Sequence, residues 1–247
     1  MRGAIGHPPA VCPRQSRVAA GSGRHHHDRM TERAVLLWIH GGGWRARADS
    51  DGGALAPLGL RVVPATHRFV PEARWPAQLD DVRAAARAAR AGADGLPLLV
   101  GGDSSGGMLA LHLALGGVDR PGDVAGALAY WAPVDPLDAE HRRLRAHDDP
   151  WTGLLGHPPA EGDPATVDAT VAGRLGSGVP VLLVHGRDDR ATPAGQALEL
   201  SRRLLAAGHP VHTWLTHGGH ALDLGRSDIR AVTAAFLDTV LPAARPD

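Results

Sequence analysis

The sequence predicts an α/β domain in which a mostly parallel sheet is covered by helices on both faces. From residue 34 onward, short apolar runs of strand length alternate with longer segments that have helical periodicity. Apolar strands separated by helices are typical of a parallel sheet that is buried on both sides. The chain has 247 residues, and one domain of that size can bury about 70–75% of its unfolded surface.

The expected strands are apolar runs, most of which end in glycine or polar residues. They cover residues 34–40, 60–65, 96–100, 124–131, 181–185 and 210–215. Proline limits two of these runs because it cannot donate a ladder hydrogen bond. Pro64 weakens the second run, and Pro97 is acceptable in the third only because it lies near the beginning.

The expected helices have alanine, leucine and valine at helical spacing. They cover residues 76–91, 105–115, 194–207 and 227–241, with a short helix within 138–147. Pro76 suits the first turn of its helix, and Ser227 is expected to be the N-cap of the last one.

Residues 1–30 show neither a helical nor a strand period and are rich in Gly, Pro, Arg and His. We interpret them as a disordered tail, or as sequence upstream of a start at Met30. The main domain is then expected at residues 31–245. Within it, residues 133–178 are rich in Pro, Asp, Gly and His and are predicted to form a short cap. The His25–His27 run is interpreted as solvated rather than as a metal site, because no acid or cysteine ligand is organised nearby.

Composition excludes several classes of function. Lys+Arg and Asp+Glu both number 26, so a net charge of zero gives no indication of nucleic acid or an anionic membrane as a partner. Cys12 is the one cysteine, which rules out an intrachain disulfide. No apolar run is long enough to span a bilayer, and the N-terminus lacks the apolar core of a signal peptide. We therefore expect a cytoplasmic protein, and nothing in the sequence indicates an oligomeric state.

The most informative motif is Gly102-Asp-Ser-Ser-Gly106, one glycine past an apolar run and directly before a predicted helix. Strand, Gly-x-Ser-x-Gly and helix in succession predict a nucleophile elbow, in which Ser104 is exposed on a strained turn above the sheet edge. Glycines two before and two after the serine prevent a clash between strand and helix. The motif alone is a weak signal in a chain with 32 glycines.

Three other strand ends carry chemically suggestive residues. The first strand leads into His40-Gly-Gly-Gly-Trp44, whose backbone N–H groups can converge on a developing oxyanion. The fifth leads into Asp188 and Asp189, and the sixth into His217 and His220. Ser, Asp and His then follow one another, each after its own strand, which is the order that α/β folds use for a catalytic triad.

These motifs make the chain resemble the α/β-hydrolase superfamily. It is most similar to the hormone-sensitive-lipase-like and acetyl-esterase/kynurenine-formamidase-like serine esterases. The resemblance rests on residues 40–44 and 102–107 and is extended by residues 66–81, 185–193 and 219–220. It covers about residues 34–241. The segment before Ala34 does not supply the antiparallel strands that open most of these folds, so we expect the N-terminal strands to be reduced or absent.

The resemblance implies roles for individual residues. Ser104 would be the nucleophile, His220 the general base and Asp189 the residue that orients His220. Gly42, Gly43 and the N–H of Ser105 would form the oxyanion hole, and His40 would hold the glycine loop. Asp188 and His217 compete with Asp189 and His220, and motif spacing favours the latter pair. This chemistry requires no metal and no organic cofactor.

The expected substrate is a small-molecule carboxylic ester, cleaved through an acyl-enzyme intermediate. Trp44, Trp131 and Trp151 are candidates for the lining of an apolar pocket, with core packing as the alternative. The basic cluster of Arg142, Arg143 and Arg145 is more typical of a solvated helix face than of an anion site. Arylformamidase or peptidase activity on the same triad, and a non-catalytic binding protein of the same fold, stay open. A metal-dependent hydrolase is disfavoured because His217 and His220 have no acid at ligand spacing.

Overall fold

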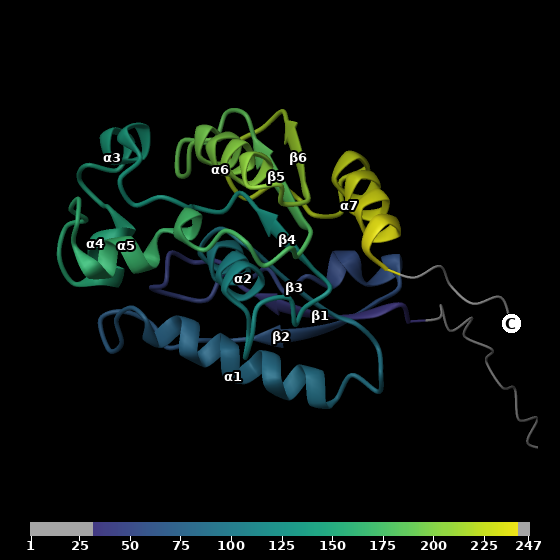
Figure 1. Cartoon of the computed structure of the whole chain (residues 1–247). Helices are drawn as coiled ribbons and strands as arrows, with labels where there is room; N and C mark the ends of the chain where they lie inside the picture. Colours follow the sequence, from purple (N-terminus) through teal and green to yellow (C-terminus); the bar gives the residue numbers. More distant parts are fainter. Residues whose placement is uncertain (1–31, 242–247) are drawn as a thin grey trace, which may run out of the picture.

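The computed structural model describes residues 32–241, which form a six-stranded sheet flanked by helices (Figure 1). Neighbouring strands are all parallel, in the order β2-β1-β3-β4-β5-β6. The predicted α/β class with a mostly parallel sheet is confirmed. Cys12, the His25–His27 run and Met30 lie outside the described residues. So does nearly all of the segment before Ala34, where we expect the N-terminal strands to be reduced or absent. Within residues 32–241 the first strand begins at Ala34.

The strands are six short segments that match the apolar runs of the sequence. They are β1 (Ala34–Ile39), β2 (Leu60–Ala65), β3 (Leu98–Asp103), β4 (Gly126–Tyr130), β5 (Val181–Gly186) and β6 (Val211–Thr216). The third strand begins after Pro97 rather than at residue 96 because the proline nitrogen cannot join the ladder. The Pro97 carbonyl still accepts a hydrogen bond from the backbone N–H of Val35. The carboxyl end of β3 is Asp103, the residue before the predicted nucleophile Ser104.

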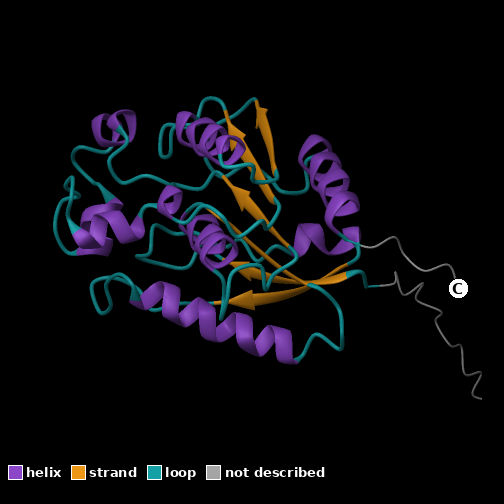
Figure 2. Ribbon diagram, viewed as in Figure 1, coloured by secondary structure: helices purple, strands orange, loops and turns teal. Residues whose placement is uncertain are grey.

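The larger helices also match the sequence pattern, and they divide between the two faces of the sheet (Figure 2). They are α1 (Ala77–Ala91), α2 (Ser105–Gly116), α6 (Gly195–Ala206) and α7 (Ser227–Val240). Apolar residues of α1, α2 and α6 pack in one core cluster, whereas those of α7 and the 3-10 helix η1 (Gly53–Leu58) pack in a second. The two clusters lie on opposite faces of the sheet, so both faces are covered.

Strand β1 shows how the apolar runs produce this arrangement. Successive side chains of a strand point to opposite faces. Val35, Leu37 and Ile39 belong to the first core cluster, while Leu36 and Trp38 belong to the second. All six residues of the strand are buried, because both of its faces meet helices. A continuous apolar run is therefore what this position in the sheet requires.

Sheet order places the functional motifs side by side. Strand β1 pairs with β2 on one edge and with β3 on the other, so the direction in which the sheet grows reverses between β1 and β3. Ligands of open α/β sheets bind at such a reversal, beyond the carboxyl ends of the strands. Ile39 is level with Gly102 in the paired strands. The glycine loop after β1 and the Gly-x-Ser-x-Gly turn after β3 therefore leave the sheet next to each other.

Residues 131–180, between β4 and β5, contain no strand but fold into short helices at one side of the molecule (Figure 1). These helices are α3 (Ala139–Leu144), α4 (Pro150–Leu155), α5 (Pro164–Ala169) and the 3-10 helix η2 (Val171–Gly173). The sequence predicts only the first of them. Asp149 and Asp163 cap α4 and α5, and each is followed by proline at the first helical position. That this segment acts as a cap, and the domain bounds themselves, stay predictions.

The predicted N-cap of α7 is wrong. Arg226 occupies the cap position, Ser227 is already helical, and no side chain makes a capping hydrogen bond. Asp228 in the first turn supplies the negative charge that a helix N-terminus favours. Its carboxylate accepts hydrogen bonds from Thr216 Oγ1 at 2.7 Å and from Arg226 Nη2 at 2.8 Å, which ties the helix to the end of β6. Across residues 32–241, no helix has both the length and the apolar character needed to cross a bilayer.

Helix α2 is buried along nearly all of its length, so shortening one of its apolar side chains should destabilise the fold. All of its residues from Ser105 to Leu115 are buried, and Leu111 is 0% exposed. We expect Leu111→Ala to lower the free energy of unfolding by roughly 2–5 kcal/mol, because it removes buried methyl groups and leaves a cavity. The matched control is Leu205→Ala in α6, at a side chain that is 63% exposed, and it should change stability by less than about 0.5 kcal/mol. Urea denaturation measures both, and equal losses would contradict the packing described.

Candidate active site

Ser104 lies on the sharp turn between β3 and α2. Its backbone angles are φ 49° and ψ −124°, which confirms the strained turn predicted from Gly-x-Ser-x-Gly. The glycines on either side allow strand and helix to approach. A Cβ atom on Gly102 would lie 2.4 Å from the carbonyl oxygen of Ile39, and one on Gly106 would lie 2.0 Å from the same oxygen. Any larger residue at either position would push α2 away from β1.

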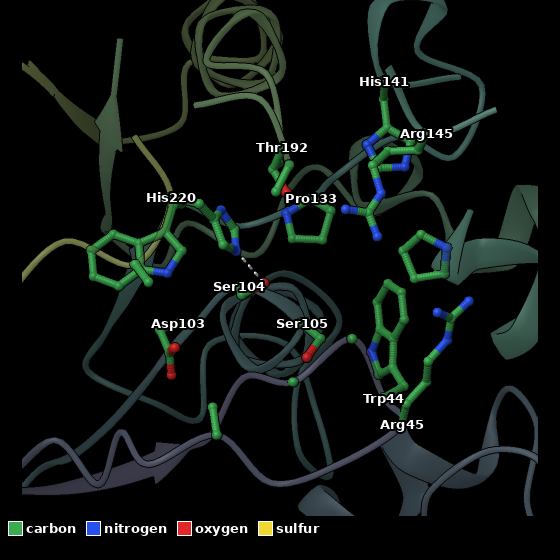
Figure 3. Close-up of a pocket in the computed structure, with 17 residues that line it drawn as sticks. Trp44, Arg45, Asp103, Ser104, Ser105, Pro133, His141, Arg145, Thr192 and His220 are labelled. Carbon is green, nitrogen blue, oxygen red and sulfur yellow. Dashed lines mark hydrogen bonds between the residues drawn. The ribbon is translucent and has the colours of Figure 1, made fainter. Parts of the chain in front are cut away.

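Three predicted residues from separate strand ends meet in one chain of hydrogen bonds. His220 Nε2 lies 3.0 Å from Ser104 Oγ (Figure 3). The other ring nitrogen, His220 Nδ1, lies 2.7 Å from Asp189 Oδ2. A carboxylate can only accept, so Nδ1 carries the proton and donates it to Asp189. Nε2 is then an acceptor for the hydroxyl of Ser104. This is the tautomer that a general base needs in order to take a proton from serine.

Asp189 is held in place by more than His220. Its side chain is 0% exposed, and Oδ1 accepts hydrogen bonds from the backbone N–H groups of Ala191 and Thr192, each at 2.9 Å. The Nε2–H group of His185 is shared between two acceptors, Asp189 Oδ2 at 3.2 Å and the carbonyl oxygen of Thr192 at 2.8 Å. Burial alone would raise the pKa of Asp189, but the hydrogen bonds from His185 and His220 outweigh it and hold that pKa well below its ordinary value. The carboxylate is therefore ionised and fixed.

The glycine loop after β1 presents backbone donors beside the serine. Among residues 32–241, we find no acceptor for the backbone N–H of Gly42, Gly43 or Ser105. Gly42 has φ +119°, and a Cβ there would lie 2.0 Å from the carbonyl oxygen of Ala46, so only glycine fits. All three residues line the same pocket as Ser104. Unpaired donors at that place are what an oxyanion hole provides.

Asp103 also lies in the site, although the sequence analysis does not predict a place for it there. Its Oδ1 accepts a hydrogen bond from the backbone N–H of Gly41 at 3.0 Å, and the residue is only 5% exposed. Burial raises the pKa of this carboxyl, although the Gly41 N–H acts in the opposite direction. Asp103 thus joins the glycine loop to the turn that carries Ser104. An acid at the end of an otherwise apolar buried strand is the signal that could have revealed it.

His40 also contacts the glycine loop, as the resemblance implies. Its Nδ1 donates to the carbonyl oxygen of Gly41 at 2.7 Å, and its ring stacks on His67 with centroids 4.9 Å apart. Burial lowers the pKa of His67, which keeps this stacked neighbour neutral. The loop is therefore fixed at its first glycine from two sides, by His40 and by Asp103.

The competing residues Asp188 and His217 lie away from this cluster. Both are exposed, and Asp188 Oδ2 accepts a hydrogen bond from the backbone N–H of Gly218 at 3.2 Å. His217 borders a separate surface hollow near Trp214 and the start of α7. The structure therefore brings Asp189 and His220, rather than Asp188 and His217, to Ser104.

A cavity of about 350 Å³ opens above Ser104. Trp44, Trp131, Pro133 and Pro150 contribute apolar walls. Trp131 lies edge-on to His220, with ring centroids 6.5 Å apart. Trp151, the third predicted lining residue, does not reach the cavity. It is fully buried behind Trp44, with ring centroids 4.8 Å apart, so it supports the wall from the core side. Among residues 32–241, no three His, Cys, Asp or Glu side chains gather as a metal site would require.

Comparison with known proteins places this geometry in a family. A family model described as alpha/beta hydrolase fold matches residues 36–220, more than half of the chain. No curated protein matches the sequence at a significant level. Many solved structures share the fold, and three of them are described below.

These three structures have low sequence identity to this chain. A truncated carbohydrate esterase from gut microbiota has a TM-score of 0.72 and 22% identity, over 85% of this chain and 86% of that one. Esterase LipW from Mycobacterium marinum has a TM-score of 0.67 and 21% identity, over 85% and 73%. The butyrate-bound esterase Est2 from Thermogutta terrifontis has a TM-score of 0.65 and 17% identity, over 87% of each chain. At this identity the likeness is one of fold.

The lowered pKa of Asp189 should make stability fall in acid. Because the folded carboxyl has a lower pKa than the unfolded one, about 3.9, its contribution is present above that pH and is lost as pH falls toward the folded value. We expect the difference in unfolding free energy between wild type and Asp189→Asn to shrink steadily below about pH 4. Urea denaturation across the acid range measures it. Asp188→Asn, which leaves Asp189 in place, should lose unfolding free energy in acid as wild type does. A difference between wild type and Asp189→Asn that stays constant with pH would contradict an ionised Asp189.

Proposed function

This chain belongs to the alpha/beta hydrolase family, and we propose that it is a serine hydrolase that cleaves carboxylic esters of small acyl groups. The observation that carries the proposal is the hydrogen-bonded series from Ser104 through His220 to Asp189, with donor–acceptor distances of 3.0 and 2.7 Å. Unpaired backbone donors beside the serine add to it. Each of these groups has a defined place in acyl transfer and no evident purpose in a binding protein.

In the proposed reaction, Ser104 Oγ attacks the ester carbonyl while His220 Nε2 takes the hydroxyl proton. Asp189 holds the imidazole in position and stabilises the positive charge that forms on it. The carbonyl oxygen, now negative, receives hydrogen bonds from the N–H groups of Gly42, Gly43 and Ser105. The protonated His220 then gives its proton to the departing alcohol oxygen, which leaves an ester of Ser104. Water, activated by the same imidazole, releases the acid and restores the serine.

The size of the cavity supports a small substrate. About 350 Å³ is near the lower end of the range of roughly 300–1,000 Å³ found for ligand pockets. One of the similar structures is named as an esterase with butyrate, a short acyl group, bound. Amide substrates, such as arylformamides or short peptides, use the same triad and stay the alternative. A cytoplasmic location likewise stays a proposal.

Removing the nucleophile tests the proposal directly. We expect Ser104→Ala to lower kcat for para-nitrophenyl acetate by at least about 10⁴-fold, because no other group replaces the attacking oxygen. Circular dichroism and urea denaturation should show that the variant is folded. A fluorophosphonate probe should label wild type at Ser104 and leave the variant unlabelled. Turnover retained in a folded variant would refute the assignment.

The choice between the adjacent acids can be tested in the same assay. Asp189→Asn should lower kcat by about 10⁴-fold, because an amide in place of the carboxylate favours the wrong tautomer of His220. Asp188→Asn, at an exposed side chain one residue away, is the matched control and should retain activity within about threefold. The opposite result would reassign the acid to Asp188.

A further inference from the structure

Two arginines line the same cavity as Ser104, although they come from distant segments. Arg45 follows the glycine loop after β1, and Arg145 lies at the end of α3. Figure 3 shows the guanidinium group of Arg145 turned into the open space between Pro133 and Trp44. Guanidinium groups bind carboxylates through paired, parallel hydrogen bonds. Esters of plain alkyl acids and alcohols have no group that would use such a cation.

The charges around the cavity leave these arginines only partly neutralised. Arg45 and Arg145 share one carboxylate, that of Asp148, whose side chain is 63% exposed. An ion pair this open to water is weak. Asp103 is the acidic residue in the cavity lining, but it is nearly buried and already accepts the Gly41 N–H. Asp149 caps α4 through the backbone N–H of Trp151 and does not line the cavity.

Arg145 also keeps a hydrogen-bond donor available in the cavity. Arg145 uses Nε for the carbonyl oxygen of Asp148 and Nη2 for its carboxylate, each at 3.2 Å. We find no partner for its Nη1 among residues 32–241. His141, which also lines the cavity, is 1% exposed and donates from Nε2 to Asp149 Oδ1 at 3.4 Å. Within the described residues, Nη1 of Arg145 is therefore the group left free to bind a ligand carboxylate.

Arg145 differs in this respect from its neighbours in the sequence. Arg142 and Arg143 line a separate surface groove beside Ala139 and Thr152, and the side chain of Arg143 is 71% exposed. The sequence expectation of a solvated basic face holds for these two. The turn at the end of α3 separates Arg145 from them and directs it to the cavity of Ser104.

We propose that the cavity selects esters that carry a carboxylate group in addition to the ester, with Arg145 as the specificity-determining residue and Arg45 beside it. This rests on the ester hydrolysis proposed above and names the substrate class for that site. The carboxylate sits either on the acyl chain, as in a half-ester of a dicarboxylic acid, or on the alcohol. In both cases it adds to, or replaces, Asp148 as the partner of the guanidinium groups.

Matched pairs of substrates test the proposal and distinguish the two positions. For the acyl arm, mono-para-nitrophenyl adipate is compared with its methyl ester, and release of nitrophenolate is followed. For the alcohol arm, para-acetoxybenzoate is compared with methyl para-acetoxybenzoate. The readout is the ratio of kcat/KM for the charged substrate to that for the neutral one. We expect a ratio above one in one arm, which places the carboxylate on that side of the ester.

Variants then assign the preference to a residue. Arg145→Gln should lower the favoured ratio by about 10- to 100-fold, the loss expected for a charge-assisted pair of hydrogen bonds. Arg145→Lys keeps the charge without the planar fork and should retain part of the preference. Arg143→Gln, at the exposed neighbour outside the cavity, is the matched control and should leave the ratio unchanged.

The possible failures are distinguishable. If wild type cleaves the neutral esters in a Ser104-dependent manner but shows no preference in either arm, the substrate class is overturned and the proposed ester hydrolysis stands. A preference that Arg145→Gln leaves intact also overturns the inference. If none of the four esters is cleaved and the fluorophosphonate probe does not label Ser104, the proposed function itself fails.

Discussion

The backbone of β1 and the first turn of α2 meet with no side chain between them, and the whole site depends on that contact. The carbonyl oxygen of Ile39 faces both Gly102 and Gly106. Because these backbones touch, the loop after β1 and the serine after β3 leave the sheet at one point, where the strand order also reverses. A methyl group at either glycine would separate the backbone N–H groups of the loop from the hydroxyl of Ser104. The glycines of the Gly-x-Ser-x-Gly motif are thus required first of all for the packing of α2 against β1.

Backbone strain gathers around this point. Five residues other than glycine have positive φ angles within residues 32–241. Four of them line the cavity, namely Trp44, Ser104, Trp131 and Ala221. Each such conformation costs of order 1–3 kcal/mol and persists only where the surroundings enforce it. At Ser104 and Trp131 the enforcement is visible, because their N–H groups donate to the carbonyl oxygens of Tyr130 and Val184 in neighbouring strands. Strain concentrated at one cavity is an independent indication that the cavity is functional.

The sequence reading succeeds where one local signal decides the structure. Apolar runs of strand length predict all six strands, and strand-end motifs predict which residues meet above the sheet. It fails where partners are distant. Asp103 gains its role from Gly41, 62 residues away, and Arg145 becomes a cavity residue only through the fold of residues 131–180. Helices α4 and α5 are also not predicted, for a different reason. Their N-cap signals, Asp149-Pro150 and Asp163-Pro164, are local and present in the sequence, but the prediction does not use them.

The residues that line the cavity differ in how many of their neighbours a substitution would disturb. The hydrogen bond from Gly41 to Asp103 joins the glycine loop to the turn that carries Ser104, so a substitution there disturbs several groups together. Pro133, His141, Arg145 and Pro150, by contrast, come from residues 131–180, which contribute no strand to the sheet. Substitutions within residues 131–180 can therefore reshape the cavity while Ser104, His220 and Asp189 keep their geometry.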